Sequence, residues 1–243
     1  MRTANPTLSD KAFMGLPTTG EHMTLDGAVN KTIILVVLGF LSAAFTWQLT
    51  YSMPEVVLPG LIVSVIVGFV LAIVTVFKKE WSPYTAPVYA LVEGVVLGAL
   101  SAFAELMFPG IVIQAIAVTF GILFALLFIY KTRIIKVTQN FRLGVFAATG
   151  GIALIYLVNF GMSFFGSGIP LIHSSGTWGI IFSLVVVVIA SMNLVLDFDF
   201  IERASQSNVP KYMEWYGAFG LMVTLVWLYI EVLRLLMKMR SRN

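Results

Sequence analysis

The chain has no cysteine and few charged residues, and each shortage excludes a class of protein. Without cysteine there is no disulfide, no thiolate metal site and no cysteine nucleophile. Charged residues make up 11% of the 243 residues, whereas hydrophobic residues make up 59%. Because a soluble domain carries roughly 25% charged residues, this chain cannot cover a water-facing surface. The composition predicts a polytopic membrane protein.

Histidine is scarce as well, and no catalytic group of residues is recognisable. His22 and His173 stand alone, which excludes a histidine metal cluster and a serine triad. An intramembrane aspartyl protease needs two facing aspartates, but Asp197 and Asp199 are two residues apart and point in different directions on a helix. We therefore expect no enzymatic activity, no catalytic residue and no resident cofactor. The basic residues lie in short loops between apolar runs, so we expect no nucleic-acid partner.

Seven segments are apolar over the roughly 20 residues that a membrane-spanning helix needs. They are Thr32–Ser52, Leu58–Phe77, Tyr84–Met107, Gly110–Tyr130, Leu143–Phe165, Trp178–Phe198 and Trp215–Met237. Their connections are short, which predicts an all-α, seven-helix domain over residues 32–237. Residues 1–31 are predicted to form a flexible tail with no signal peptide, and residues 238–243 a short basic tail.

Lysine and arginine in the loops predict the orientation. Eleven of them fall in the tail and in the second, fourth and sixth loops, and none falls in the first, third or fifth loop. This asymmetry predicts a multi-pass protein of the plasma (inner) membrane with a cytoplasmic N-terminus. The basic residues after the seventh segment break the pattern: Lys238, Arg240 and Arg242. Either the last helix tolerates the wrong flank, which we favour, or it re-enters the membrane and returns.

Small residues recur every four positions in the third segment, at Gly94, Gly98 and Ala102. Such a stripe allows two membrane helices to approach closely. The run "AATGG" at 147–151 either does the same in the fifth segment or loosens it locally.

Carboxylates inside the spans need a reason, because a charge at the bilayer centre costs several kcal/mol. Glu93 lies about 14 Å into the third helix, at 1.5 Å per residue. It is either a protonated structural acid or a functional acid facing a cavity, and we favour the second. Asp197, with Asn193 one turn deeper, resembles the mouth of a polar path. Asp199 and Glu202 are interpreted as solvated helix ends, with Asp199 interfacial.

Two further acids belong to the last segment. Glu231 can pair with Arg234 three residues on, near the outer face. Glu214 stands at the start of that helix, where a negative charge stabilises the helix dipole, and is expected at the interface.

Three stretches resemble the bacterial Bax inhibitor-one-like family, within the transmembrane Bax-inhibitor-motif superfamily. They are "APVYALVEGVVLGALSAFAELMFPGIVIQA", "LVLDFDFIE" and "EWYGAFGLMVTLVWLYIEVLRLL". The resemblance implies seven helices, with two three-helix layers around the last one, and a calcium leak that responds to pH. In that superfamily two acids, late in the sixth helix and in the seventh, are thought to share a proton and gate the pore.

Residue by residue, the resemblance implies the following roles. Asp197 is similar to the first gating acid, and Glu93 to the family's acid in the third helix. The second gating acid is Glu231 if "LYIE" is matched, whereas matching the later "LRLL" puts Thr224 at that place. Depth argues against a direct contact between Asp197 and Glu231.

Our leading hypothesis is therefore a calcium (cation) leak channel whose partners are the bilayer, calcium and protons. Carboxylates at Asp197 and Glu93 are hard oxygen ligands of the kind calcium prefers. The alternative is a non-conducting interaction protein that modulates a membrane protease or a stress-response complex. A proton-coupled transporter ranks third, because no inverted repeat is evident.

Overall fold

The computed structural model of the chain describes residues 20–166, 168–169 and 174–242. Seven long α-helices and one 3-10 turn make up almost all of these residues. They are α1 (Leu25–Ser52), α2 (Pro54–Phe77), η3 (Lys79–Trp81), α3 (Ser82–Met107), α4 (Ile111–Lys131), α5 (Gln139–Ser163), α7 (Thr177–Ser205) and α8 (Met213–Ser241). The described residues contain no strand beyond an isolated bridge between His22 and Pro210. All seven helices are long and apolar enough to cross a bilayer, so the chain is a multi-pass membrane protein, as predicted.

The first helix begins earlier than predicted, at Leu25 instead of Thr32. Thr24 caps it, because its hydroxyl accepts a hydrogen bond from the Gly27 amide at 3.0 Å. The residues just before the cap are also held: the amide of Met23 donates to the carbonyl of Val209 at 2.8 Å. The prediction of a flexible tail over residues 1–31 is therefore wrong for residues 20–31. Residues 1–19 lie outside the described part.

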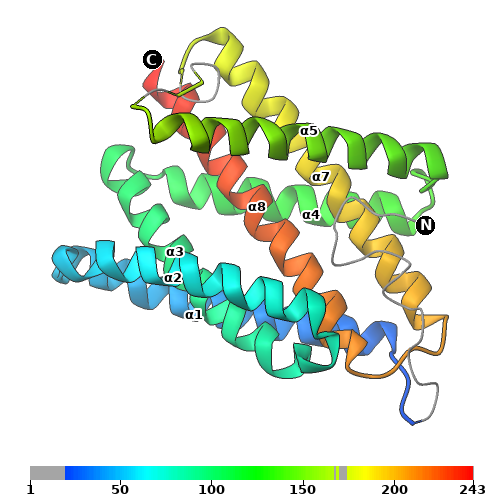
Figure 1. Cartoon of the computed structure of the whole chain (residues 1–243). Coiled ribbons are helices and arrows are strands. Elements are labelled where there is room, and N and C mark those ends of the chain that lie inside the picture. The colour runs from blue at the N-terminus through cyan, green and yellow to red at the C-terminus, as the bar shows by residue number, and fades with distance from the viewer. Residues whose placement is uncertain (1–19, 167, 170–173, 243) are drawn as a thin grey trace.

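Two groups of helices are visible in Figure 1, with α8 crossing diagonally between them. One group contains α1, α2 and α3, and the other contains α4, α5 and α7. Helix α8 packs against α1, α3, α4 and α7. Its most apolar stretch is 61% buried, against 11% for α2 and for α5. Burial of this kind explains how α8 can carry more polar residues than a lipid-facing helix.

The last helix does not re-enter the membrane. Helix α8 is continuous for 29 residues from Met213 to Ser241, which rules out the re-entrant alternative. Lys238 of the unexpected basic flank is buried, and its ammonium donates to the carbonyl of Gly179 at 3.0 Å and to the hydroxyl of Ser183 at 2.8 Å. The charge is thus held against the first turns of α7, a contact that loop counting cannot reveal.

Helices α1 and α3 approach each other through the predicted small-residue stripe. A Cβ atom added at Gly94 or Gly98 would come closer than 3.0 Å to the backbone of Gly39 or Ala43 in α1. At the same contact the Ser42 hydroxyl donates to the carbonyl of Leu91 at 2.6 Å. The stripe is therefore filled from within the chain and is closed to an outside partner.

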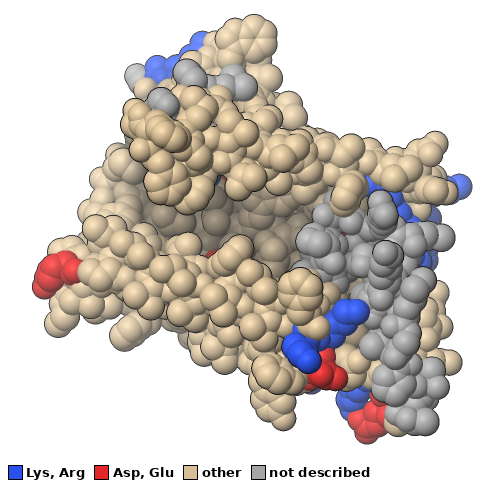
Figure 2. Space-filling model, in the orientation of Figure 1, with Lys and Arg blue, Asp and Glu red and all other residues tan. Residues whose placement is uncertain are grey.

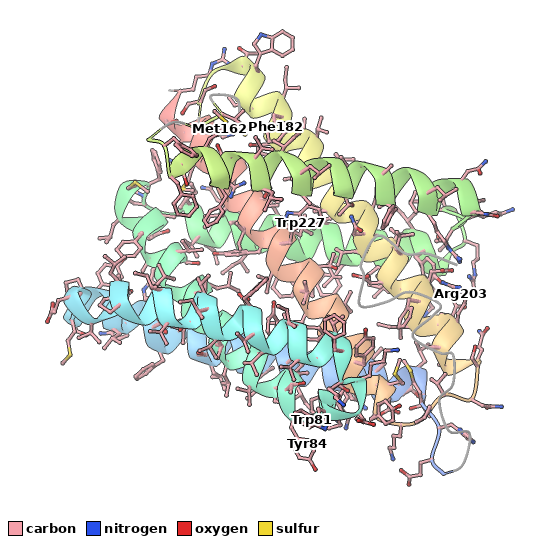
Figure 3. The ribbon with its side chains drawn as sticks, viewed as in Figure 1. Trp81, Tyr84, Met162, Phe182, Arg203 and Trp227 are labelled. Atoms are coloured by element: carbon pink, nitrogen blue, oxygen red, sulfur yellow. The ribbon has the colours of Figure 1, made fainter. Side chains whose placement is uncertain are left out.

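The connections α2–α3, α4–α5 and α7–α8 gather at one end of the molecule, and the end of α8 lies at the opposite end (Figure 1). Trp81, in the first of these connections, and Tyr84, in the first turn of α3, are 53% and 79% exposed (Figure 3). Aromatic side chains in such places are typical of a membrane–water interface. The chain therefore has two distinct polar ends, which we call the loop end and the α8 end.

Space between the two groups of helices remains open on both sides of α8. Figure 2 shows a broad hollow on the face where α2 and α5 lie in front. Between α1, α3, α4 and α8 there is a cavity of about 380 Å³ with mostly apolar walls that include Trp47, Phe120 and Leu225. Polar side chains of α7 and α8 that lie between the two groups can therefore border open space as well as packed neighbours.

Candidate functional site

Asp197 is buried deep in α7. Its side chain is 1% exposed. The sequence placed it at the helix end, but α7 continues to Ser205, so eight residues, or about 12 Å of helix, separate it from that end. The helix extends because "FIERAS" packs and pairs with neighbouring helices, although it is too polar to be recognised as part of a span. Asp197 is thus an acid enclosed in the bundle.

Asn193, one turn deeper, is also buried and links α7 to α5. Its side-chain amide donates to the Thr149 hydroxyl at 2.8 Å and to the Ile189 carbonyl at 2.9 Å. Thr149 belongs to the "AATGG" run, whose Gly150 and Gly151 have open space where a Cβ would lie. That run therefore provides a hydroxyl to α7, and its glycines make no close helix contact within the described residues.

Asp199 and Glu202 are not solvated helix ends, so that interpretation was wrong. The Asp199 carboxylate accepts from Arg142 of α5 at 2.7 Å and from Arg203 at 3.0 Å, and its side chain is 14% exposed. Glu202 accepts from Tyr130 and is paired with Arg133, both near the end of α4. Figure 3 shows Arg203 at the loop end of α7. These groups form a charged layer, which we call the loop-end ion cluster, between Asp197 and the loop end.

Thr224, one of the two candidates for the second gating position, lies near the depth of Asp197. Helices α7 and α8 are antiparallel, since the last turns of α8 meet the first turns of α7 at Gly179. Thr224 is eleven residues into α8, or roughly 16 Å, close to the 12 Å that separates Asp197 from the adjoining end of α7. It is 4% exposed, and its hydroxyl donates to the carbonyl of Gly220 at 3.3 Å. A hydroxyl therefore occupies this level of α8.

Glu231, the other candidate, is held by partners near the α8 end. The Arg234 guanidinium donates to both of its carboxylate oxygens, at 3.0 and 3.2 Å, which confirms the predicted pair. The Tyr156 hydroxyl of α5 donates to the same carboxylate at 2.9 Å and accepts from Arg234 at 2.6 Å. Glu231 is eighteen residues into α8, or about 27 Å, so some 15 Å along the axis separate it from the level of Asp197.

Glu93 lies in the middle of α3 and faces the second helix. A Cβ added at Gly68 of α2 would come 3.3 Å from a Glu93 carboxylate oxygen. The side chain is half-buried, and the buried Tyr89 lies one turn before it on the same face. Helix α2 packs mainly against α3. Glu93 therefore belongs to the α2–α3 contact, whereas Asp197 belongs to a helix that packs against α4, α5 and α8.

Glu214 begins α8, as expected, but its carboxylate is used by another helix. One oxygen accepts from the Thr24 amide at 3.0 Å and from the Thr24 hydroxyl at 2.9 Å. The side chain is 2% exposed, so its carboxylate is enclosed by the protein. It stabilises the first turn of α1, where unpaired backbone amides favour a negative charge.

Several polar residues of this arrangement were missed from sequence. Arg142, Thr149, Tyr156 and Lys238 each bind a group on another helix. An arginine or lysine beside a span resembles an ordinary loop charge, and Tyr156 resembles an ordinary apolar position. The unexpected charge of the last flank singles out Lys238, but no local signal distinguishes the other three, because their partners are distant in the sequence.

The described residues include no group of three or more histidines and carboxylates arranged to hold a metal ion. His173 lies outside the described residues, and the ring of His22 contacts the Asn208 carbonyl at 3.1 Å. What the structure offers is a buried acid at Asp197, amide and hydroxyl groups near its depth, and a layer of ion pairs on its loop-end side. Such a set can exchange a proton or a weakly held cation.

Comparison with known proteins gives one clear result. A family model described as Bax inhibitor 1 like matches residues 5–241, nearly the whole chain. Neither the comparison with curated proteins nor the one with solved structures gives a match. The chain therefore belongs to the Bax inhibitor 1 like family.

Proposed function

We propose that this protein lets cations, with calcium as the main candidate, leak across a membrane, and that the protonation of Asp197 controls the leak. The observation that carries the proposal is the 1% exposure of the Asp197 side chain inside a membrane bundle, in a chain of this family. A carboxylate in such a place is costly to keep charged without a bound cation or nearby donors. Its charge state and the occupancy of the path are therefore coupled.

The residues near its depth suit a path for hard cations. Asn193 and Thr149 bring an amide and a hydroxyl together between α7 and α5, and Thr224 brings a buried hydroxyl to a similar depth of α8. Oxygen atoms of carboxylates and side-chain amides are ligands that calcium prefers. Acidification would add a proton to Asp197, weaken cation binding and change the packing of α7. In this mechanism the protein is a channel and catalyses no reaction.

The structure favours a gate with one acid in place of two. Glu231 is bound to Arg234 and Tyr156, and the polar residue that α8 carries close to the depth of Asp197 is Thr224, which is not an acid. We assign Glu93 a separate role, as a second cation or proton site at the α2–α3 contact. We also place the chain in the plasma (inner) membrane, with the loop end in the cytoplasm, on the basis of its Lys and Arg residues.

Calcium flux into liposomes that contain the pure protein, measured between pH 5 and pH 8, tests the proposal. The wild-type leak should change with pH, and Asp197→Asn should lose that dependence. Glu93→Gln should lower the rate and keep the pH profile. Glu55→Gln, at an exposed position, is the control and should match the wild type. An unchanged pH profile in Asp197→Asn would exclude the proposed gate.

A non-conducting interaction protein remains the second candidate, and one observation favours it. A Cβ added at Gly144, Gly150 or Gly151 of α5 would meet nothing within 4 Å among the described residues, so this face could receive a helix of another membrane protein. Such a partner could be a membrane protease or a stress-response complex. A stoichiometric partner that co-purifies, together with no flux through the pure protein, would replace the channel proposal.

A further inference from the structure

A second cavity, with polar side chains in its wall, lies at the α8 end, far from Asp197. It is a cleft of about 640 Å³ between the last turns of α8, the end of α5 and the end of α3. Its walls include Tyr156, Arg234, Lys238, Met107, Phe108 and Met237. The proposed cation path makes no use of it.

The cleft carries a net positive charge. Arg234 and Lys238 line it, and none of its lining residues is acidic. The nearest acid among the described contacts is Glu231, which lies behind Arg234 with 1% exposure and neutralises one of the two cations. One charge remains, with Arg240 and Arg242 just beyond in the chain. Figure 2 shows blue side chains at this end of the molecule.

The two cations also have hydrogen-bond donors to spare. Arg234 uses Nη1 for Glu231 and Tyr156, and its Nη2 and Nε make no hydrogen bond within the described residues. The ammonium of Lys238 has three donors, of which two are directed to Gly179 and Ser183. Glu231, Tyr156, Gly179 and Ser183 therefore hold both side chains in place, so little ordering is needed when an anion binds.

The remaining walls match an amphiphilic ligand. Met107, Phe108 and Met237 give the cleft an apolar side. Helix α8 has 29 residues, or about 43 Å, so it is longer than the roughly 30 Å hydrocarbon core of a bilayer, and we expect its last two turns near the headgroups. Guanidinium forks and ammonium groups bind phosphate oxygens through charged hydrogen bonds.

We propose that this cleft binds a phosphate anion, held by Arg234 and Lys238. The anion is either the headgroup phosphate of an anionic phospholipid, whose chains cover Met107 and Phe108, or free phosphate. The phosphate site is separate from Asp197. Evidence against phosphate binding would therefore leave the leak proposal standing, and evidence against the leak would leave the phosphate proposal standing.

Native mass spectrometry of the full-length protein in detergent tests this proposal. Phosphatidylglycerol is titrated against phosphatidylcholine, and inorganic phosphate is added as a competitor. The wild-type protein should retain phosphatidylglycerol in preference to phosphatidylcholine. Lys238→Gln should weaken that binding roughly tenfold, as expected for the loss of one charged hydrogen bond. Arg240→Gln removes the same charge from an exposed position and should stay within about twofold of wild type.

Arg234→Lys is the second variant, because it keeps the charge beside Glu231 and loses the fork. It should also weaken binding, which keeps the test decisive if Lys238→Gln does not fold. Competition by phosphate at millimolar concentration would identify free phosphate as a ligand, and resistance to it would identify the lipid headgroup. Equal retention of the two lipids with no phosphate binding, or equal loss in the Lys238 and Arg240 variants, would overturn the proposal.

Discussion

Helices α3 and α5 are attached to the bundle in opposite ways. Helix α3 is fixed to α1 by close backbone contact at Gly94 and Gly98. Helix α5 is joined to α7 and α8 by polar side chains: Thr149 to Asn193, Arg142 to Asp199 and Tyr156 to Glu231. The glycines of α5 that could have made a close contact, Gly150 and Gly151, meet nothing within 4 Å among the described residues.

This difference teaches where the molecule can respond to a proton. A contact between backbones is set by van der Waals packing and does not depend on charge. A helix held by ion pairs and single hydrogen bonds changes its position when those groups change their charge state. We infer that α5, next to Asn193 and the loop-end ion cluster, is the element that moves if Asp197 gates a path, whereas α1 and α3 form the stationary part.

The largest expected effect comes from filling one glycine in each helix. Gly98→Ala places a Cβ against the backbone of Ala43, and overpacking of this kind should lower the free energy of unfolding by about 3 kcal/mol. Gly151→Ala adds the same atom where space is open. Since alanine is the better helix former, it should raise stability by up to about 1 kcal/mol. Equilibrium unfolding in mixed detergent measures both.

The comparison depends on the opposite signs of these two effects. If both variants lose stability equally, α5 is packed as closely as α3 and the distinction between the two helices is wrong. Flux measurements on Gly151→Ala add a second check, because a stabilised but still mobile α5 should keep its pH dependence.

A smaller effect is expected from the ion pairs that bind α7 to its neighbours. Arg142→Met removes a partner of Asp199 in a pair with side chains 8% and 14% exposed. The free energy of unfolding should fall by about 2 kcal/mol. This is less than for a buried charge left without any partner, because Arg203 still binds Asp199. Arg133→Met removes the partner of Glu202, but its side chain is 63% exposed, so less than about 1 kcal/mol should be lost.

Equilibrium unfolding in mixed detergent, with both variants at the same salt concentration, measures the two losses in the free energy of unfolding. Equal losses would mean that water reaches the Arg142–Asp199 pair more than the exposed fractions of its side chains indicate. If the difference in burial holds, raising the salt concentration should weaken the Arg133–Glu202 pair more than the Arg142–Asp199 pair, because buried charges are screened less.

The sequence predicts correctly those features that depend on residues close together in the chain. Seven apolar runs gave seven helices, the Gly94–Gly98 spacing gave a close contact, and Glu231 with Arg234 gave an ion pair three residues apart. Each of these depends on residues that are close in the chain, so hydropathy and helical periodicity reveal them. The family followed from motifs of the same local kind.

The errors share the opposite cause. The sequence predicts a solvated end at Asp199 because its main partner, Arg142, is 57 residues away on another helix. The contact of Glu214 with Thr24 is likewise not predicted from sequence, because Thr24 lies 190 residues earlier. Such pairs are set by how helices pack, and one sequence carries no measure of that packing.

The smallest effect is expected where the N-terminal segment meets the α7–α8 connection. Lys211 donates to Glu21, which lowers the pKa of the Glu21 carboxyl and raises the pKa of the Lys211 ammonium through the hydrogen bond and the opposite charge. Because the pKa of Glu21 is lowered, its stabilising contribution is complete above the ordinary value of 4.5 and is lost as pH falls through the lowered one. The contribution of Lys211 is complete below its ordinary value of 10.5 and is lost only above it.

The stabilising contribution of the Glu21–Lys211 pair should therefore be constant from pH 5 to pH 8, the range in which Asp197 is proposed to act. Hydrogen exchange of the Met23 and Lys211 amides, which donate to Val209 and Glu21, measures how firmly the segment is held. Glu21→Gln should speed exchange slightly at all pH values in this range, because both side chains are exposed and screened by water. A pH dependence of this exchange that disappears in Asp197→Asn would instead show that the segment follows the gate, and would extend the mobile part of the molecule from α5 to the start of α1.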